Sequence, residues 1–217
     1  MWLEFNGEDH MASSISEVIK TRRSIKKYSE EEISKEMLSS ILEACQWAPS
    51  AHNAQPWRFI VVRDHLHKQN LAKNMAVRWE EDLSGDGIPK AERKRLIEDS
   101  VMQFSGSPIV IIACLTMKDM DQYPNEQRRN AEHIMGVQSV AAAIENLLLA
   151  AHDVGLGACW FCAPLFCPDA VRETLRIPKH MEPQALITLG YPSKQPNPPA
   201  RRALTTIVYE EYWGTPT

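Results

Sequence analysis

The sequence lacks the motifs that mark several large enzyme classes. It contains no Walker or Gly-x-Gly-x-x-Gly fingerprint, no Gly-x-Ser-x-Gly elbow and no His-Glu-x-x-His zinc helix. Gly155-Leu156-Gly157 lacks the third glycine of a dinucleotide fingerprint and precedes an expected strand instead of a helix. Hydrolase functions and a Rossmann-type nucleotide site therefore have little support.

A charge excess and a long apolar run are also missing. The 217 residues carry a net charge of −4, so no broad basic excess exists to neutralise nucleic-acid phosphates. No run approaches the roughly 20 apolar residues that span a membrane, and residues 1–9 lack the features of a signal peptide. Five cysteines, an odd number, suit a reducing cytoplasm better than a disulfide framework. We expect one cytoplasmic domain over residues 1–217, with a tail at 1–12, an extended arm at 191–217, and no nucleic-acid or membrane partner.

Regular elements alternate along the chain but have unequal connections. Helical stripes and capping residues, among them Ser14 and Asp64, predict helices over residues 15–21, 34–48, 65–83, 89–106, 129–153 and 168–176. Apolar runs predict strands over residues 57–62, 108–115, 155–161 and 183–190. The unequal connections favour an α+β fold with a mixed sheet over a regular doubly wound one.

A cluster of cations follows the first expected helix. Four cations and a hydroxyl occupy six positions: Arg22, Arg23, Ser24, Lys26 and Lys27. Like charges this close repel unless an anion lies among them. Charge-assisted hydrogen bonds to such an anion are worth about 1.5–3 kcal/mol each, against about 0–1 kcal/mol for an exposed pair. Taken alone, the segment is more simply a solvated basic turn.

A polar loop precedes the first expected strand. Ser50, His52, Asn53 and Gln55 stand among small residues within residues 48–57. Their hydroxyl, imidazole and amide groups could bind a flat polar ligand. Alternatively, the loop is a connection whose side chains satisfy their own backbone. Both interpretations stay open at this point.

A Cys-x-x-Cys pair, Cys159 and Cys162, is followed by Cys167. This spacing suits a redox dithiol or half of a metal site. A redox dithiol usually opens a helix, however, whereas this pair lies in or just after a strand, and a metal site would need a further ligand. We therefore interpret these residues as buried structural cysteines and predict no metal.

Four segments together resemble the nitroreductase family of FMN-dependent oxidoreductases. Residues 22–26, 48–57 and 155–160 and the late Arg201-Arg202 pair occur in the family's order, and the resemblance runs from about Ile15 to Trp213. Residues 78–83, 85–87 and 183–186 are most similar to a branch that includes the C-terminal reductase domain of the bifunctional enzyme making the deazaflavin coenzyme of actinobacteria and archaea.

The resemblance implies a nitroreductase-like mixed central sheet surrounded by helices, in a homodimer with exchanged terminal arms and FMN at the interface. It implies that the FMN phosphate and ribityl chain are held by Arg22, Arg23, Ser24 and Lys26, with Arg201 and Arg202 reaching in from the tail. It also implies that the partner subunit supplies the loop residues Ser50, His52, Asn53 and Gln55.

The isoalloxazine ring would face the strand residues Trp160, Phe161, Cys162 and Ala163, and the substrate would lie near Trp79 and Asp82. The implied activity passes a hydride from NAD(P)H through FMN to a small nitroaromatic, quinone or enone by ping-pong turnover. No side chain is predicted as catalytic, because the flavin carries the chemistry. The alternatives are a reductase of a deazaflavin-coenzyme precursor, a deazaflavin-dependent enzyme, a non-catalytic flavin-binding protein and a cysteine-based redox protein.

Overall fold

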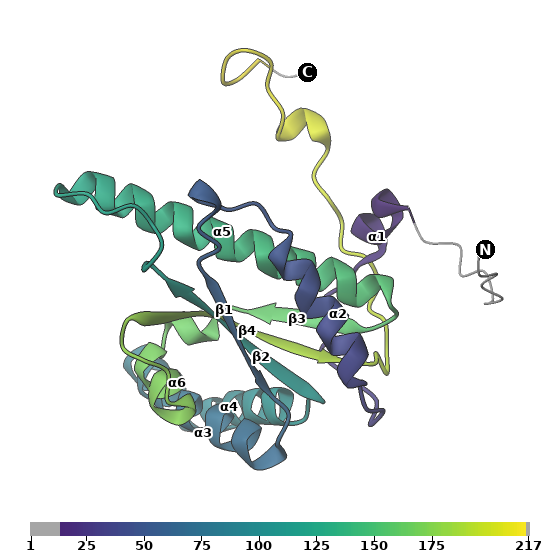
Figure 1. Ribbon diagram of the computed structural model, residues 1–217. Coiled ribbons are helices and arrows are strands. Elements are labelled where there is room, and N and C mark those ends of the chain that lie inside the picture. Colours follow the sequence, from purple (N-terminus) through teal and green to yellow (C-terminus); the bar gives the residue numbers. More distant parts are fainter. Residues whose placement is uncertain (1–13, 216–217) are drawn as a thin grey trace, which may run out of the picture.

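The computed structural model describes residues 14–215, so the predicted tail at 1–12 lies outside the described residues. Six helices and four strands alternate along the described chain (Figure 1). The helices are α1 (Ile15–Thr21), α2 (Lys35–Gln46), α3 (His65–Gly85), α4 (Lys90–Ser105), α5 (Glu126–Asp153) and α6 (Pro168–Leu175). The strands are β1 (Trp57–Val62), β2 (Ile109–Thr116), β3 (Gly157–Phe161) and β4 (Met181–Gly190).

The four strands form one sheet in the order β1-β2-β4-β3, and every neighbouring pair is antiparallel. β1 and β3 are therefore its two outer strands. A single parallel bridge, between Ser24 and Ala158, adds the segment after α1 to the β3 edge. The predicted α+β class is confirmed, and the mixed character of the sheet is limited to this bridge.

Helices cover both faces of the sheet. All eight residues of the inner strand β2 are therefore buried. Its residues Ile109, Ile111, Ala113 and Leu115 belong to a core shared with α2 and α5, and the alternate residues Val110, Ile112 and Cys114 belong to a core shared with α3, α4 and α6. Figure 1 shows these two helical layers on opposite sides of the sheet. A strand buried on both faces reads as a continuous apolar run.

The helix starts follow local capping chemistry. The Ser14 hydroxyl accepts a hydrogen bond from the Glu17 N–H at 3.3 Å, and the Asp64 carboxylate accepts one from the His67 N–H at 2.8 Å. Pro89 precedes α4 as its N-cap instead of lying in its first turn. α5 begins three residues earlier than the expected position 129, because Asn125 accepts from the Arg128 N–H.

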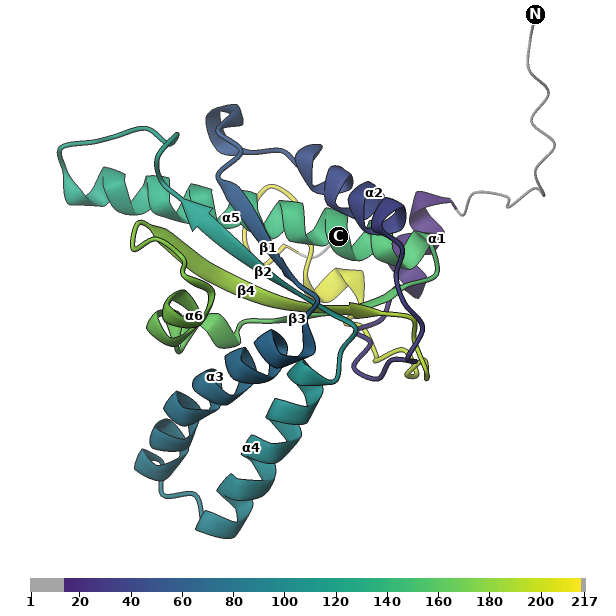
Figure 2. The same cartoon turned by 60° about the horizontal axis from the view of Figure 1, so that its bottom comes forward.

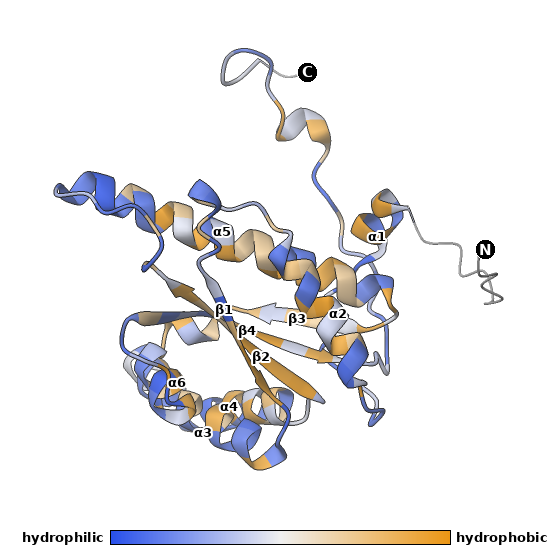
Figure 3. Ribbon diagram, in the orientation of Figure 1, coloured by the Kyte–Doolittle hydropathy of each residue, from blue (hydrophilic) through white to orange (hydrophobic). Residues whose placement is uncertain are grey.

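α5 is, among the described residues, the one helix whose length and composition would allow it to cross a membrane. Its apolar residues instead face the sheet and α2, and Ile144, Leu147 and Ala151 are fully buried. Figure 3 shows its apolar part over the sheet and its polar first turns beyond the sheet's edge. These contacts are those of a core helix.

The proline-rich arm after β4 leaves the body of the molecule (Figure 1). It contains one short 3₁₀ helix, Leu204–Thr206, and its tip is closed by a ring contact of 4.7 Å between Tyr209 and Trp213. Leu204 and Trp213 are 70% and 90% exposed, respectively. In a single chain the apolar side chains of the arm thus have little to pack against.

Candidate functional site

The basic segment after α1 lies along the free edge of β3. The backbone N–H of Ile25 donates to the Ala158 carbonyl at 3.0 Å, next to the Ser24–Ala158 bridge. A Cβ on Gly157 would come within 2.6 Å of the Ile25 side chain, so glycine is what lets the segment approach the strand so closely. The sheet therefore fixes Ser24 and its flanking cations in place.

The cations of this segment are poorly neutralised among the described residues. Arg22 has only a loose pair with Glu145, at 3.9 Å, and Arg23 donates to two backbone carbonyls, those of Lys20 and Arg22. Within residues 14–215, Lys26 has no ion pair. Burial lowers the pKa of the neighbouring His152, and the guanidiniums of Arg22 and Arg23 lower it further. The segment consequently has a positive potential that an anion would relieve.

Lys26 connects the basic segment to the end of β3. Its ammonium lies over the Phe161 ring, 5.5 Å from the centroid. The other neighbour of this ring is Phe104 of α4, in an edge-to-face contact with centroids 5.1 Å apart. After Phe161 the chain turns at Cys162 into a short 3₁₀ helix, Ala163–Leu165. The indole N–H of Trp160, on the same strand, is buried and has no hydrogen-bond partner in the described part of the chain.

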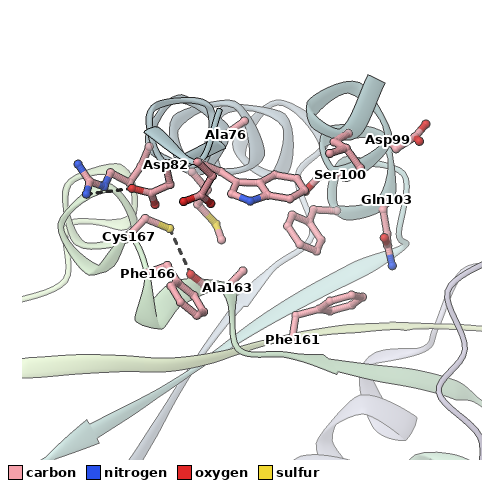
Figure 4. Close-up of a pocket in the computed structure, with 15 residues that line it drawn as sticks. Ala76, Asp82, Asp99, Ser100, Gln103, Phe161, Ala163, Phe166 and Cys167 are labelled. Carbon is pink, nitrogen blue, oxygen red and sulfur yellow. Dashed lines mark hydrogen bonds and ion pairs between the residues drawn. The ribbon is translucent and has the colours of Figure 1, made fainter. Parts of the chain in front are cut away.

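A cavity of about 580 Å³ opens beside Phe161, between the α3–α4 pair and the turn after β3 (Figure 4). Its lining includes Trp79 and Asp82 of α3, which the resemblance assigns to the substrate, together with Phe161 and Ala163, which it assigns to the ring. Phe104 and Phe166 add further aromatic surface. The two predicted substrate residues and two of the predicted ring-facing residues therefore line the same cavity.

The charged and amide side chains of this cavity come from α3, α4 and Asp86, which follows α3. Arg78 pairs with Asp82 at 3.1 Å and also with Glu81, a residue outside the cavity lining, at 3.0 Å. Gln103 of α4 lines the cavity with an amide nitrogen that is buried and lacks a hydrogen-bond partner in residues 14–215. Figure 4 places Gln103 on the same side of the cavity as Ser100 and Asp99.

The polar loop ahead of β1 has an unusual backbone. His52, Asn53 and Gln55 have positive φ angles of 55°, 52° and 46°. Such left-handed conformations are uncommon for residues other than glycine. Ser50 stabilises the turn because its hydroxyl accepts from the Gln55 N–H at 3.1 Å. The loop is thus held in a costly conformation, which is typical of functional segments.

His52 is anchored to α5 by a residue that the sequence interpretation missed. Its Nε2 lies 2.8 Å from a carboxylate oxygen of Glu132 and 3.9 Å from one of Asp121. Glu132 is only 1% exposed, and its second oxygen has no partner among the described groups. The ligand atoms of the three residues lie within 4.8 Å of one another and could also hold a metal ion. No local sequence signal connects Glu132 with His52, because the two residues are 80 positions apart.

The structure does not bring all predicted residues together within one chain. The loop with Ser50, His52, Asn53 and Gln55 leads into β1, whereas Arg22, Arg23, Ser24 and Lys26 lie at β3, and two strands separate these edges. Arg201 and Arg202 are exposed on the arm, without an ion pair or side-chain hydrogen bond among the described residues. One chain therefore assembles the basic segment, the end of β3 and the cavity.

The cysteines are free in the structure. Cys159 and Cys167 are buried and Cys162 is exposed, so the expectation of burial fails for Cys162 because it lies in the turn after β3. Burial raises the pKa of Cys167 to about 11 and also raises the pKa of Cys159. Such thiols are largely protonated at neutral pH and react slowly. A dithiol mechanism gains no support from this arrangement.

Comparison with known proteins identifies similar chains over most of this length. Residues 19–191 match the model of the nitroreductase family. A protein of Methanothermobacter thermautotrophicus, described as an NADH dehydrogenase/NAD(P)H nitroreductase, is 34% identical over 84% of this chain and 79% of its own. An Archaeoglobus fulgidus protein of the same description is 35% identical over 82% and 85% of the two chains.

A solved structure shares the fold. The crystal structure of a protein from Desulfovibrio desulfuricans, described as a nitroreductase in complex with FMN, has a TM-score of 0.68 and 27% identity. The similarity covers 93% of this chain and 98% of the other. The shared fold therefore extends over nearly the whole of both chains.

Proposed function

This chain belongs to the nitroreductase family, and we propose that it is an FMN-dependent NAD(P)H oxidoreductase acting on small electron-poor organic acceptors. The main support for the proposal is that a basic segment and an aromatic cavity lie next to each other in one chain. The under-neutralised cations of residues 22–26 lead through the Lys26–Phe161 contact to an aromatic cavity. FMN has a dianionic phosphate at one end and a flat ring at the other, so its phosphate matches the basic segment and its ring matches the aromatic cavity.

The donor set of the basic segment fits the phosphate end of FMN. Arg22 and Lys26 present cationic donors with little competition from carboxylates, and Ser24 adds an exposed hydroxyl. An arginine guanidinium can donate two parallel hydrogen bonds to the oxygens of one phosphate. We assign Arg22, Arg23, Ser24 and Lys26 to the phosphate and ribityl chain.

The end of β3 fits the ring. Trp160 and Phe161 supply flat surface, and backbone N–H groups at the turn of Cys162 and Ala163 would donate to a ring nitrogen. Trp79 and Asp82 would then face the ring across the cavity. Bound FMN would supply the hydride and electron transfer, and the protein orients the reactants and excludes water from the aromatic cavity.

A partner subunit is needed to complete the site. The loop residues Ser50, His52, Asn53 and Gln55 lie at the far edge of the sheet from the basic segment in one chain, and Arg201 and Arg202 lie on an arm that leaves the body. We propose that in a homodimer each chain supplies this loop and arm to the FMN of the other. Exposed apolar side chains support such an interface, including Ile15 at 67% and Trp47 at 80% exposure.

A single cavity beside the ring surface favours ping-pong turnover, in which NAD(P)H and the acceptor occupy the same space in succession. In each turnover, NAD(P)H and one proton reduce the acceptor by two electrons, and NAD(P)⁺ is released. We propose no side chain as an obligatory proton donor. The five unpaired cysteines agree with a reducing cytoplasmic location.

The test begins with FMN binding to purified protein, followed by anaerobic addition of NADH, NADPH or a reduced deazaflavin. We expect a yellow protein whose flavin absorbance is bleached by a nicotinamide donor and restored by an acceptor. The variant Arg22→Ala should bind FMN at least roughly tenfold more weakly, since one charge-assisted hydrogen bond is worth about 1.5–3 kcal/mol. Lys73→Ala, an exposed cation on α3, is the control and should leave the affinity unchanged.

Each outcome separates one interpretation from another. Protein that stays colourless after FMN addition would contradict the proposal. Bleaching by reduced deazaflavin alone would favour a deazaflavin-dependent enzyme of the branch that the sequence resembles. Bound FMN that no donor reduces would favour a flavin-binding protein without turnover.

A further inference from the structure

The charges of the cavity wall point to a preference among acceptors. Resting on the proposed function, we infer that the site selects neutral or cationic aromatic acceptors that carry a nitro or carbonyl oxygen, and disfavours anionic ones. The selection comes from the charged and aromatic residues that α3 and α4 contribute to the cavity, whereas the basic segment that we assign to the phosphate contacts Phe161 through Lys26.

The charged groups of the wall are mostly acidic. Three carboxylates (Asp82, Asp86 and Asp99) and one guanidinium (Arg78) line the cavity, so the formal net charge of the lining is −2. Figure 4 places Asp99 beside Ser100 at one end of the lining. An anionic acceptor would therefore enter against repulsion.

The one guanidinium in the lining is already engaged. Arg78 contacts Asp82 at 3.1 Å and Glu81 at 3.0 Å, so two carboxylates neutralise its charge. A carboxylate or phosphate on the acceptor would have to displace one of them. The cavity thus differs from the basic segment, where Arg22 has a single loose partner at 3.9 Å.

The uncharged part of the wall indicates what the acceptor looks like. Trp79, Phe104, Phe161 and Phe166 form an aromatic lining suited to a flat ring. The Gln103 amide nitrogen is buried there without a partner among the described residues. An unpaired buried donor is costly, and a nitro or carbonyl oxygen on the acceptor would satisfy it.

The experiment uses ligands that cannot be reduced, so it reports binding apart from turnover. Benzyltrimethylammonium, benzyl alcohol and benzoate are titrated into the FMN-loaded protein, and the dissociation constants are read from changes in the flavin spectrum. We expect benzoate to bind roughly tenfold more weakly than benzyltrimethylammonium at low salt, because two unit charges about 4 Å apart interact by about 1 kcal/mol in water. The difference should be smaller at high salt, because salt screens the interaction.

Two matched variants locate the effect in the wall. Asp82→Asn removes a carboxylate of the lining, and Glu81→Gln removes the other partner of the same guanidinium from outside the lining. Asp82→Asn should reduce the ratio of the benzoate dissociation constant to the benzyltrimethylammonium dissociation constant by about threefold or more. Glu81→Gln should reduce this ratio less. Anaerobic reoxidation of the chemically reduced protein by 4-nitrobenzyl alcohol and 4-nitrobenzoate should follow the same order.

Gln103→Leu tests the second half of the inference. It should slow reoxidation by 4-nitrobenzyl alcohol about tenfold while the affinity for benzyltrimethylammonium, which offers no oxygen, stays within twofold. Equal binding of the three ligands, tighter binding of benzoate, or equal effects of Asp82→Asn and Glu81→Gln would overturn the selection by charge. Protein that binds no FMN would instead contradict the proposed function.

Discussion

Replacement of Gly157 by alanine should detach the basic segment from β3 without unfolding the protein. The added Cβ would lie 2.6 Å from both Cβ and Cγ1 of Ile25. Ordinary contacts between carbon atoms are about 3.5–4.0 Å, so Ile25 must move by roughly 1 Å. Because Ile25 is 5% exposed and its N–H donates to Ala158, the movement carries Ser24 and Lys26 with it.

The magnitude of this change favours a folded but impaired variant. Overpacking of a core typically costs about 1–3 kcal/mol, against total stabilities of about 5–15 kcal/mol. Losing one charge-assisted hydrogen bond to the phosphate would weaken FMN binding at least roughly tenfold. The effect on cofactor affinity should therefore be evident under conditions in which the fold persists.

The assay measures the FMN dissociation constant by fluorescence titration and the unfolding midpoint of the apo-protein in urea. Gly85→Ala is the matched control, because a Cβ at Gly85 meets nothing within 4 Å. It should leave FMN affinity unchanged and stabilise α3 by about 0.5–1 kcal/mol. A Gly157→Ala protein that loses stability yet binds FMN with unchanged affinity would refute the reasoning.

Two further predictions concern the buried Lys68 and the half-buried His152. Lys68→Ala removes hydrogen bonds to the carbonyls of Ser107 and Pro108 and should lower the free energy of unfolding by about 1–3 kcal/mol in urea titrations, whereas Lys73→Ala should change it by less than about 0.5. The lowered pKa of His152 means that the unfolded chain binds this proton more tightly, so stability should fall as pH drops below the ordinary value of 6.5. His152→Gln should flatten that slope below about pH 6.5, and the exposed His65→Gln should not.

Local chemistry made the elements predictable. The strand at 57–62 has the predicted bounds, since an apolar run follows a loop of small polar residues. Ser14 and Asp64 cap their helices as expected. Asn125 was missed as a cap because the preceding residues are polar and irregular, so the stripe alone set the expected start of α5.

The arrangement of strands was beyond the sequence. Periodicity gives the faces of β2 but not its neighbours, and the order β1-β2-β4-β3 depends on long-range pairing. For the same reason nothing local predicts the contact between Lys26 and Phe161, and the family resemblance implied only that each of them binds FMN. His52 and Glu132 are likewise 80 positions apart, and nothing local connects them.

The α3–α4 pair projects from the body as a helical hairpin, joined to the sheet mainly at its base (Figure 2). Leu71, Met75 and Phe104 belong to the core, whereas residues toward the tip, such as Asp86, face the cavity or solvent. The hairpin can consequently change sequence or length in its outer half while the cofactor surface stays constant. Evolution, or a laboratory graft of hairpins between relatives, could thus alter the range of acceptors by exchanging one module.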